Sequence, residues 1–382
     1  RYATIDSLTH HQSFEISTSP FAKFTVDKIF IDEHQFSTKP PLLSAILACI
    51  YGSYTKITAR TLHTHPRETL YLLNLFVGLT STLFLLFYAH KTLSLWTEDF
   101  VLRIAGFSIL AIGYLGFSYA TTLNNHTPTA AALLAAFFIA YKKHLMYPTS
   151  PLSFAFAGLM LGSASAFEHG AALLCLGFFL YFLRLDPKRT LALVLPAALV
   201  PLLINMYLNY LMLGSWMPVQ MQPELYTSTI NYWHNPEQSS IDALQSPKWR
   251  YLFHFLFGHH GIFSFTPVLI FSLPALVDAL RKRKDYYFEA LTVSISLALM
   301  LAYYVLRTHN YGGICTGARW FILIMPMLVL FALRFAEMHP RPLMRSLFWF
   351  TLGIGIYNTL TTMASPWQLP AWYNYFLSLG WA

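Results

Sequence analysis

Long apolar segments separated by short polar ones occupy most of the chain. A helix of about 20 apolar residues crosses the hydrocarbon core of a bilayer. From residue 68 onward, segments of about this length, or a little shorter, recur at 68–90, 100–121, 127–143, 151–167, 170–184, 190–213, 262–280, 286–306, 319–336 and 343–363. The pattern predicts an all-α polytopic membrane protein with about ten spans.

The first 67 residues follow a different pattern. Residues 1–38 are polar and mixed, with a short amphipathic helix predicted over 2–11 and a looped stretch after it. The apolar segment 40–54 opens with two prolines, which suit the first turn of a helix. At about 15 residues it is short for a span, so we expect a juxtamembrane helix that dips into the outer leaflet without crossing.

This pattern defines one membrane domain, predicted over residues 1–364, with no separate soluble domain. Residues 1–67 and 214–257 form two polar loops that we expect on the same side of the membrane. Residues 365–382 are rich in Trp and Tyr, which concentrate at membrane interfaces, and are predicted to form an interfacial tail.

Composition supports a membrane protein. Hydrophobic residues make up 55% of the chain and charged residues 11%, and the mean hydropathy is +0.47. A soluble domain carries about 25% charged residues. Charged residues are therefore too few to cover the surface of a soluble protein of 382 residues.

The net charge of +8 comes from lysines and arginines that gather in the loops 142–143, 184–189, 281–284 and 334–345. An even number of predicted spans separates each loop from the next, so all four lie on one face. Cytoplasmic loops are enriched in Lys and Arg, which predicts that this face is cytoplasmic. The same rule accounts for the charge without a nucleic-acid partner.

The opposite, extracytoplasmic face collects ionisable residues near the ends of the spans. Such groups are costly at membrane depth and indicate function. Each also has a structural alternative: Lys39 as a lysine that extends to the interface, His126 as a helix-opening residue, and Glu168 with His169 as a local ion pair. The set is Asp27, Asp32, Glu33, Lys39, His126, Glu168, His169, His259, His260 and Arg319.

Three further members of this set also have alternative interpretations. Arg319 comes after "YGGICTGA" and is either an interface anchor or a bidentate clamp for a phosphate. His259 and His260 are adjacent, and neighbouring residues on a helix do not face the same way. We therefore predict no metal site there, and a divalent cation has no clear ligand set in the sequence.

Several motifs resemble those of the GT-C fold glycosyltransferases, namely the protein O-mannosyltransferase type and the bacterial lipid A aminoarabinose transferases. Arg1-Tyr2-Ala3 and Lys39-Pro40-Pro41-Leu42 are similar to two blocks of that family. The segment "SAFEHGAALL" is similar to its Thr-Lys-Gly turn. The segments "FGHHGIFSFTPVLIFSLPAL" and "YGGICTGARWFILIMPML" resemble an uncharacterised bacterial subgroup.

The resemblance implies a GT-C type bundle whose active site faces away from the cytoplasm. It implies a polyprenyl-phosphate sugar as donor, with the donor phosphate at Lys39 and Arg319. The main catalytic acid of the family lies just before the Arg-Tyr-Ala block, which here falls upstream of Arg1, together with a first membrane span. On the resemblance we therefore expect an N-terminally truncated chain.

The segment "TTLNNHTPTAAALLAAF" departs from the family, because His126 stands at the usual second acidic position. A histidine can orient an acceptor, but it does not replace a carboxylate as a metal anchor. We therefore leave the catalytic acid unassigned. The catalytic candidates within the chain are His126, Glu168, Asp32 and Glu33, and the candidates for the substrate pocket are Tyr2, Phe36, His169, His259 and His260.

The predicted function is an inverting membrane glycosyltransferase of a bacterial inner membrane that acts on the periplasmic side. Its acceptor is a lipid, a glycan or a protein. Two alternatives remain. A transporter or lipid-handling protein predicts inverted repeats and broken helices at the midplane, and a catalytically dead relative predicts that the upstream acid is missing.

Overall fold

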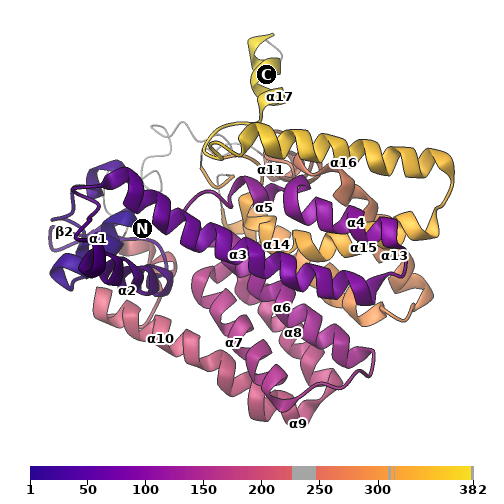
Figure 1. Ribbon diagram of the computed structural model, residues 1–382, viewed down its shortest axis with the longest axis horizontal. Helices are drawn as coiled ribbons and strands as arrows, with labels where there is room; N and C mark the ends of the chain where they lie inside the picture. The colour runs from indigo at the N-terminus through magenta and orange to yellow at the C-terminus, as the bar shows by residue number, and fades with distance from the viewer. Residues whose placement is uncertain (226–246, 309–310, 314, 380–382) are drawn as a thin grey trace.

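The computed structural model describes residues 1–225, 247–308, 311–313 and 315–379, and Figure 1 shows their arrangement. Most of the described residues are helical. The helices are α1 Tyr2–His11, α2 Pro41–Thr58, α3 Pro66–Trp96, α4 Phe100–Ser108, α5 Leu115–Ser118, α6 His126–His144, α7 Pro151–Phe167, α8 Ala172–Leu185, α9 Pro187–Arg189, α10 Leu195–Leu213, α11 Lys248–Leu256, α12 Ile262–Phe265, α13 Ser272–Lys282, α14 Tyr287–Arg307, α15 Met325–Met338, α16 Pro342–Thr362 and α17 Ala371–Ser378.

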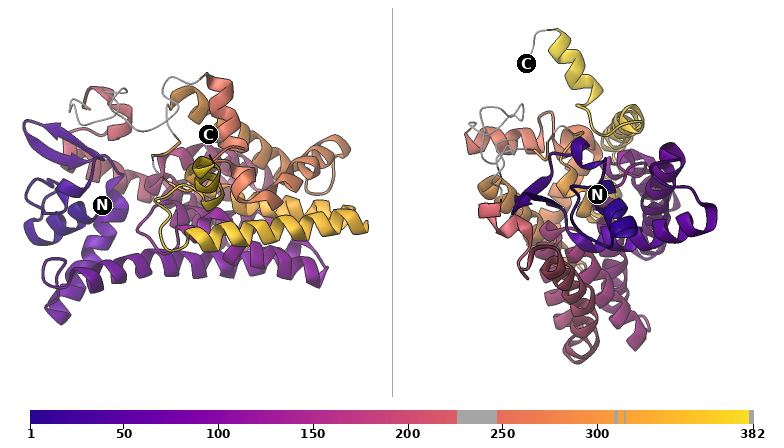
Figure 2. Two further views of the ribbon diagram at one scale, coloured as in Figure 1. Left: turned by 90° about the horizontal axis from the view of Figure 1, so that it is seen from above. Right: turned by 90° about the vertical axis from the view of Figure 1, so that its left-hand side faces the viewer.

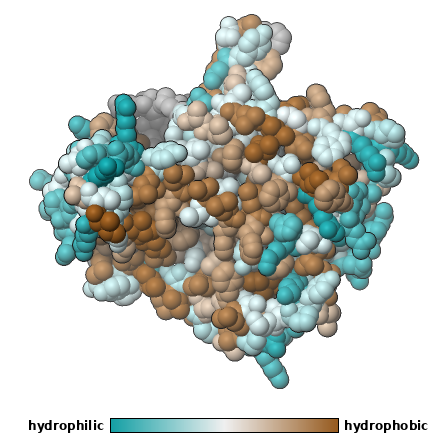
Figure 3. Space-filling model, viewed as in Figure 1, coloured by the Kyte–Doolittle hydropathy of each residue, from teal (hydrophilic) through white to brown (hydrophobic). Residues whose placement is uncertain are grey.

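Four helical segments are long and apolar enough to cross a membrane: Pro66–Trp96, Phe100–Ser118, Pro187–Leu213 and Tyr287–Arg307. In Figure 3, apolar side chains cover the middle of the visible face, and polar ones gather toward its two ends. The protein is therefore an integral membrane protein. The predicted number of about ten spans is not confirmed. One reason is that α6 is rich in alanine and buried along most of its length, so it packs inside the bundle.

Two predicted spans are broken in the structure. Segment 262–280 is divided into α12, a 3-10 helix at Pro267–Phe271 and α13. Pro267 has no N–H to donate and its ring interferes with a continuous α-helix. Segment 319–336 likewise opens with a 3-10 helix, Arg319–Leu323, before α15 begins at Met325. The pattern of apolar residues alone does not show where a helix is broken in this way.

The helix α6 packs against both α3 and α7, and α7 packs against α10. The contact between α7 and α10 depends on Gly158 and Gly162. A Cβ atom at Gly158 would lie 2.2 Å from the carbonyl oxygen of Val194, and one at Gly162 would lie 2.1 Å from that of Ala198. Glycines four residues apart let two membrane helices approach at backbone distance.

The N-terminal region lies at one end of the bundle (Figures 1 and 2). The predicted helix over 2–11 is confirmed as α1, which packs on α2. A β-hairpin that was not predicted follows, formed by β1 Lys28–Ile31 and β2 His34–Ser37. Its turn residues, Asp32 and Glu33, have φ values of 48° and 70°. Hairpin turns with positive φ usually carry Asn-Gly or Asp-Gly. The Asp-Glu sequence found here therefore did not indicate a hairpin turn.

The basic loops meet at the other end of the bundle. Lys143 Nζ lies 3.5 Å from Asp186 Oδ2, and the Arg184 guanidinium lies 3.5 Å from the centre of the Phe288 ring. Arg334 lies over the Tyr286 ring at 4.9 Å. The prediction that these loops share one face is confirmed. Residues 226–246 of the predicted second loop and 380–382 of the predicted tail lie outside the described residues.

Replacing Gly162 with alanine should destabilise the protein, because the new methyl group meets the Ala198 carbonyl. Overpacking of this kind costs about 1–3 kcal/mol, which thermal unfolding in detergent measures as a lower midpoint. Gly353→Ala is the matched control, since a Cβ at Gly353 meets nothing within 4 Å. Equal midpoints for the two variants would show that the close approach of α7 and α10 is not needed.

Candidate functional site

The candidate site is built around Glu168, which follows the last residue of α7 and precedes a short 3-10 helix. Its side chain is 15% exposed. The Asn125 side-chain amide donates to the Glu168 carboxylate and also, at 3.2 Å, to the Phe167 carbonyl. His126 Nδ1 lies 3.2 Å from the same carboxylate. A buried carboxylate is thus joined to the residues that open α6.

The start of α6 explains why these two side chains face Glu168. Asn124 caps the helix, because its Oδ1 accepts from the Thr127 backbone N–H at 2.8 Å. Its own amide donates to the Tyr119 carbonyl at 2.7 Å. Asn125 is not needed for capping, and its side chain is available for Glu168. The His126 position predicted for the site is therefore accompanied by Asn125, whose role the sequence did not show.

Lys39 lies beside Asp27, with Nζ 3.0 Å from Oδ2. The hairpin produces this pair. Lys28 is paired with Ser37, and the Thr38 N–H donates to the Asp27 carbonyl at 3.1 Å, so the residues that flank the two strands are neighbours. The side chains of Lys39 and Asp27 are 31% and 43% exposed, and the pair is open to solvent on one side.

Two arginines complete the cluster. Arg1 Nη1 donates to the carbonyl of Pro40 at 3.3 Å, which holds it next to Lys39. The Arg319 guanidinium lies 5.2 Å from the centre of the Trp367 ring. The segment that carries Trp367 is fixed by Thr316, whose hydroxyl donates to the Gln368 carbonyl at 2.6 Å. The cluster thus combines segments from almost the whole length of the chain.

The charges of these residues act on one another. Burial alone would raise the pKa of Glu168, but the charges of His126, His169 and Arg319 outweigh it and hold that pKa below its ordinary value of 4.5. Burial also opposes ionisation of Asp27, yet Lys39 and Arg319 hold its pKa below 3.8. Because Asp27 is partly solvent-exposed, the lowering by the cations dominates. Both carboxylates are ionised at neutral pH.

Several buried nitrogen atoms around Glu168 lack a hydrogen-bond partner among the described residues. They are Nη2 of Arg1, Nδ1 of His126, Nε2 of His169 and Nε of Arg319. The charge of Glu168 acts on all four side chains. Buried donors without acceptors are rare. Their convergence at one place is typical of a binding site for an anion.

Other predicted site residues lie elsewhere. Asp32 and Glu33 are exposed at the tip of the hairpin, and the structure does not bring them to Glu168. Phe36 packs in a small apolar cluster with Phe14 and Ile29. The Tyr2 hydroxyl, on α1, donates to the side-chain carbonyl of Asn74 on α3.

His259 and His260 are buried in an aromatic cluster around Tyr311. His260 stacks on Tyr311 with ring centres 4.9 Å apart, and His259 stacks on Tyr373 at 4.7 Å. The next residue, Gly312, lies against Arg319, because a Cβ atom there would come within 3.1 Å of Arg319 Nε. The two histidines therefore support the segment that precedes Arg319.

Sequence reasoning assigned no role to Arg1 or Asp27 in the site, and it missed Gln220. Asp27 was noted only as a polar residue on this face, and the hairpin register that pairs it with Lys39 was not predicted. The Gln220 side chain donates to the Thr38 carbonyl and interacts with His169. Nothing in the local sequence around Gln220 indicates this long-range contact.

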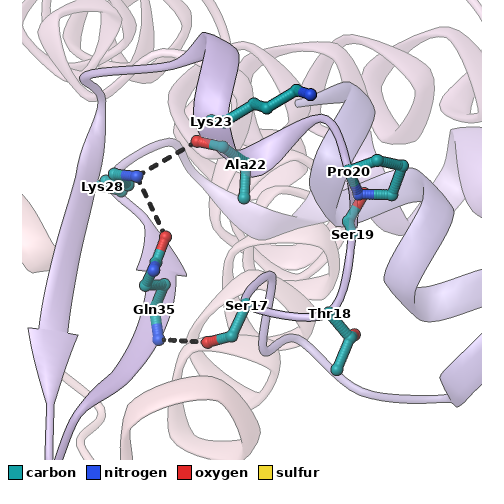
Figure 4. Close-up of a pocket in the computed structure, with 8 residues that line it drawn as sticks. All are labelled: Ser17, Thr18, Ser19, Pro20, Ala22, Lys23, Lys28 and Gln35. Carbon is teal, nitrogen blue, oxygen red and sulfur yellow. Dashed lines mark hydrogen bonds between the residues drawn. The ribbon is translucent and has the colours of Figure 1, made fainter.

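A polar hollow of about 330 Å³ lies in the same N-terminal region (Figure 4). Lys28 lines it and donates to the carbonyl of Ala22 at 3.1 Å and to Gln35 Oε1 at 3.0 Å. The Gln35 N–H donates to the Ser17 hydroxyl at 2.9 Å. The lining contains none of the residues predicted for the site from the sequence, so this hollow is separate from the Glu168 cluster.

Comparison with solved structures identifies the fold. The structure is similar to the crystal structure of ArnT from Cupriavidus metallidurans, a lipid A aminoarabinose transferase, with a TM-score of 0.53 and 16% identity. The match covers 93% of this chain and 57% of ArnT, so the chain spans a little over half of that protein's length. The resemblance to GT-C glycosyltransferases inferred from the sequence is confirmed at the level of the fold.

Two archaeal structures resemble the chain more weakly. The oligosaccharyltransferase AglB from Archaeoglobus fulgidus, in complex with an inhibitory peptide and a dolichol-phosphate, matches 96% of the chain and 51% of its own, with 13% identity and a TM-score of 0.47. An apo oligosaccharyltransferase of the same organism matches 98% and 53%, with 14% identity and a TM-score of 0.48. No protein-family model and no curated protein matches the sequence.

The lowered pKa of Glu168 predicts acid sensitivity with a defined sign. Below the ordinary pKa of 4.5, the unfolded chain binds a proton that the folded protein still excludes. The free energy of unfolding therefore falls with the pH and continues to fall until the folded-state pKa is passed. The part of the fall in the unfolding midpoint that Glu168 causes should therefore appear below about pH 5.

Glu168→Gln should flatten part of that decline, whereas Glu98→Gln, an exposed change near the opposite end of the bundle, should leave it unchanged. Parallel curves for all three proteins would contradict the assignment of the acid-sensitive group to Glu168.

Proposed function

We propose that the protein is a membrane glycosyltransferase that moves a sugar from a polyprenyl-phosphate donor to an acceptor on the extracytoplasmic face. The observation that carries the proposal is the convergence of Lys39 with buried, unpaired nitrogens of Arg1, His169 and Arg319. This cluster lies at the end of the bundle opposite the basic loops. A lipid phosphate that arrives from the bilayer supplies the acceptor oxygens that these donors lack.

The reaction follows from the positions of the charges. An acceptor hydroxyl or amine attacks the anomeric carbon of the sugar, and a new glycosidic bond forms with inversion. The bond between that carbon and the phosphate oxygen breaks, and its electron pair leaves with the polyprenyl phosphate. Lys39 and Arg319 stabilise the negative charge that develops on this leaving group.

The acceptor's proton needs a base, and among the described residues we assign that role to Glu168. Its carboxylate is ionised at neutral pH, oriented by Asn125 and stabilised by the charge of Arg319. His126 Nδ1 lies 3.2 Å from it. Asp27 is the second carboxylate of the cluster, but its pairing with Lys39 suits it to fixing that lysine for the phosphate.

The shared fold is a second support for this proposal. ArnT and this chain have the same architecture at 16% identity, and that level of likeness extends to the fold alone. The positive-inside distribution of Lys and Arg supports the orientation, with the Glu168 cluster on the side away from the cytoplasm.

Removing either phosphate-binding cation should abolish most transfer. We expect Lys39→Ala and Arg319→Ala each to lower the rate of sugar transfer from a polyprenyl-phosphate donor by about 10²–10³-fold. The measurement is transfer of radiolabelled sugar in membranes that contain the full-length protein. Lys23→Ala and Arg307→Ala, which remove exposed cations on the same side, are the matched controls. Wild-type rates in both site variants would refute the phosphate-binding role.

Glu168→Gln tests the base separately from the phosphate site. The amide keeps the size of the side chain but does not accept the proton, so we expect transfer to fall by about 10²–10⁴-fold while donor binding is retained. Donor binding is measured as protection against thermal unfolding by a polyprenyl phosphate. A variant that transfers sugar normally, or that also loses donor binding, would rule out this division of roles. Glu98→Gln serves as the control.

A further inference from the structure

Three side chains that bind metals in other proteins meet beside α1, outside the Glu168 cluster. Asp6 Oδ1 lies 2.9 Å from His63 Nε2 and 3.7 Å from His10 Nε2. One ligand atom from each residue lies within 4.8 Å of those from the other two. Among the residues that the structure describes, this is the group whose members could share one ion.

The fold brings the three together from two segments. Asp6 and His10 are four residues apart on α1 and therefore share one face of the helix. His63 comes from the short connection between α2 and α3. Tyr51 of α2 fixes that connection, since its hydroxyl accepts from the Leu62 N–H at 2.8 Å and lies 3.1 Å from His10 Nε2.

The carboxylate is positioned by a second hydrogen bond on its other oxygen. The Ser19 hydroxyl donates to Asp6 Oδ2 at 2.7 Å, which turns Oδ1 toward the two imidazoles. Asp6 itself is 1% exposed, whereas the side chains of His10 and His63 are 30% and 45% exposed. A bonded outer partner of this kind is the usual way in which proteins orient a metal-binding carboxylate.

The distances between the ligand atoms help to decide whether the three residues share an ion or only form hydrogen bonds with one another. Ligand atoms about 2.1 Å from a tetrahedral zinc ion are about 3.4 Å from one another. The contacts of Asp6 with His63 and His10, at 2.9 and 3.7 Å, lie on either side of that value. The longer contact exceeds a hydrogen bond. His10 Nε2 instead lies 3.1 Å from the Tyr51 hydroxyl, and an ion at this position would take the place of that contact.

We propose that Asp6 Oδ1, His10 Nε2 and His63 Nε2 bind a divalent transition-metal ion of the zinc class. Two imidazole nitrogens and one carboxylate oxygen suit such an ion, whereas Ca²⁺ and Mg²⁺ prefer oxygen ligands. The exposed histidines leave one coordination position for water. The ion joins α1 to the connection before α3, and α1 follows directly on Arg1 of the Glu168 cluster.

The test uses the full chain, purified without a histidine tag, stripped with chelator and titrated with Zn²⁺ or Co²⁺. We expect one equivalent of Co²⁺ to bind and give the visible absorption of tetrahedral cobalt. We also expect Zn²⁺ to raise the thermal unfolding midpoint, because an ion that binds only the folded state stabilises it. His10→Ala and His63→Ala should each weaken the metal affinity by at least about tenfold, the lower end of the loss that an outer-shell change alone causes.

His11→Ala and His65→Ala are the matched controls, since each removes an exposed imidazole within two residues of a proposed ligand. Both should bind the metal as the wild type does. Because Asp6 also holds Ser19, the histidine variants rather than an Asp6 variant decide the outcome, and their metal-free unfolding midpoints show that they are folded. Loss of the bound equivalent in the controls, or its full retention in His10→Ala and His63→Ala, would overturn the proposal. These metal-binding readouts do not depend on sugar transfer.

Discussion

One buried carboxylate determines how the polar end of the molecule is arranged. Glu168 is largely removed from water, and an isolated carboxylate in such a place is strongly destabilising. It is tolerated because Asn125 donates to it and because the charges of His126 and Arg319 act on it. These partners come from separate parts of the chain. The same requirement that stabilises the ion therefore fixes the relative positions of α6, α7 and the segment before α15.

The apolar pattern predicted much of the helical architecture, since helix α1 and the stretches 151–167 and 343–363 match the structure closely. Its failures have physical causes. A run of apolar residues does not show where Pro267 interrupts the backbone, and Asp-Glu is an unusual sequence for a tight hairpin turn. The number of membrane-crossing helices was uncertain because a buried helix such as α6 and a lipid-facing helix both read as apolar.

The site was less predictable than the fold. Lys39, Glu168, His126 and Arg319 were identified because ionisable residues are costly near a membrane. The structure brings them together, whereas Asp32 and Glu33, selected by the same rule, lie at an exposed turn. The cost of placing an ionisable residue near a membrane identifies residues that need an explanation. Tertiary contacts, however, determine which partners those residues have. Asp27 depends on the hairpin register, and Asp6, His10 and His63 depend on the packing of α1 against the connection between α2 and α3.

The contact of Arg319 with Trp367 has a consequence for the order in which the protein matures. Trp367 follows α16, so it emerges from the ribosome after nearly all of the membrane helices. Arg319 therefore has no aromatic partner until synthesis is almost finished, and Thr316 has no carbonyl of residue 368 to hold. The surroundings of Arg319 are therefore completed only when the segment that follows α16 is in place.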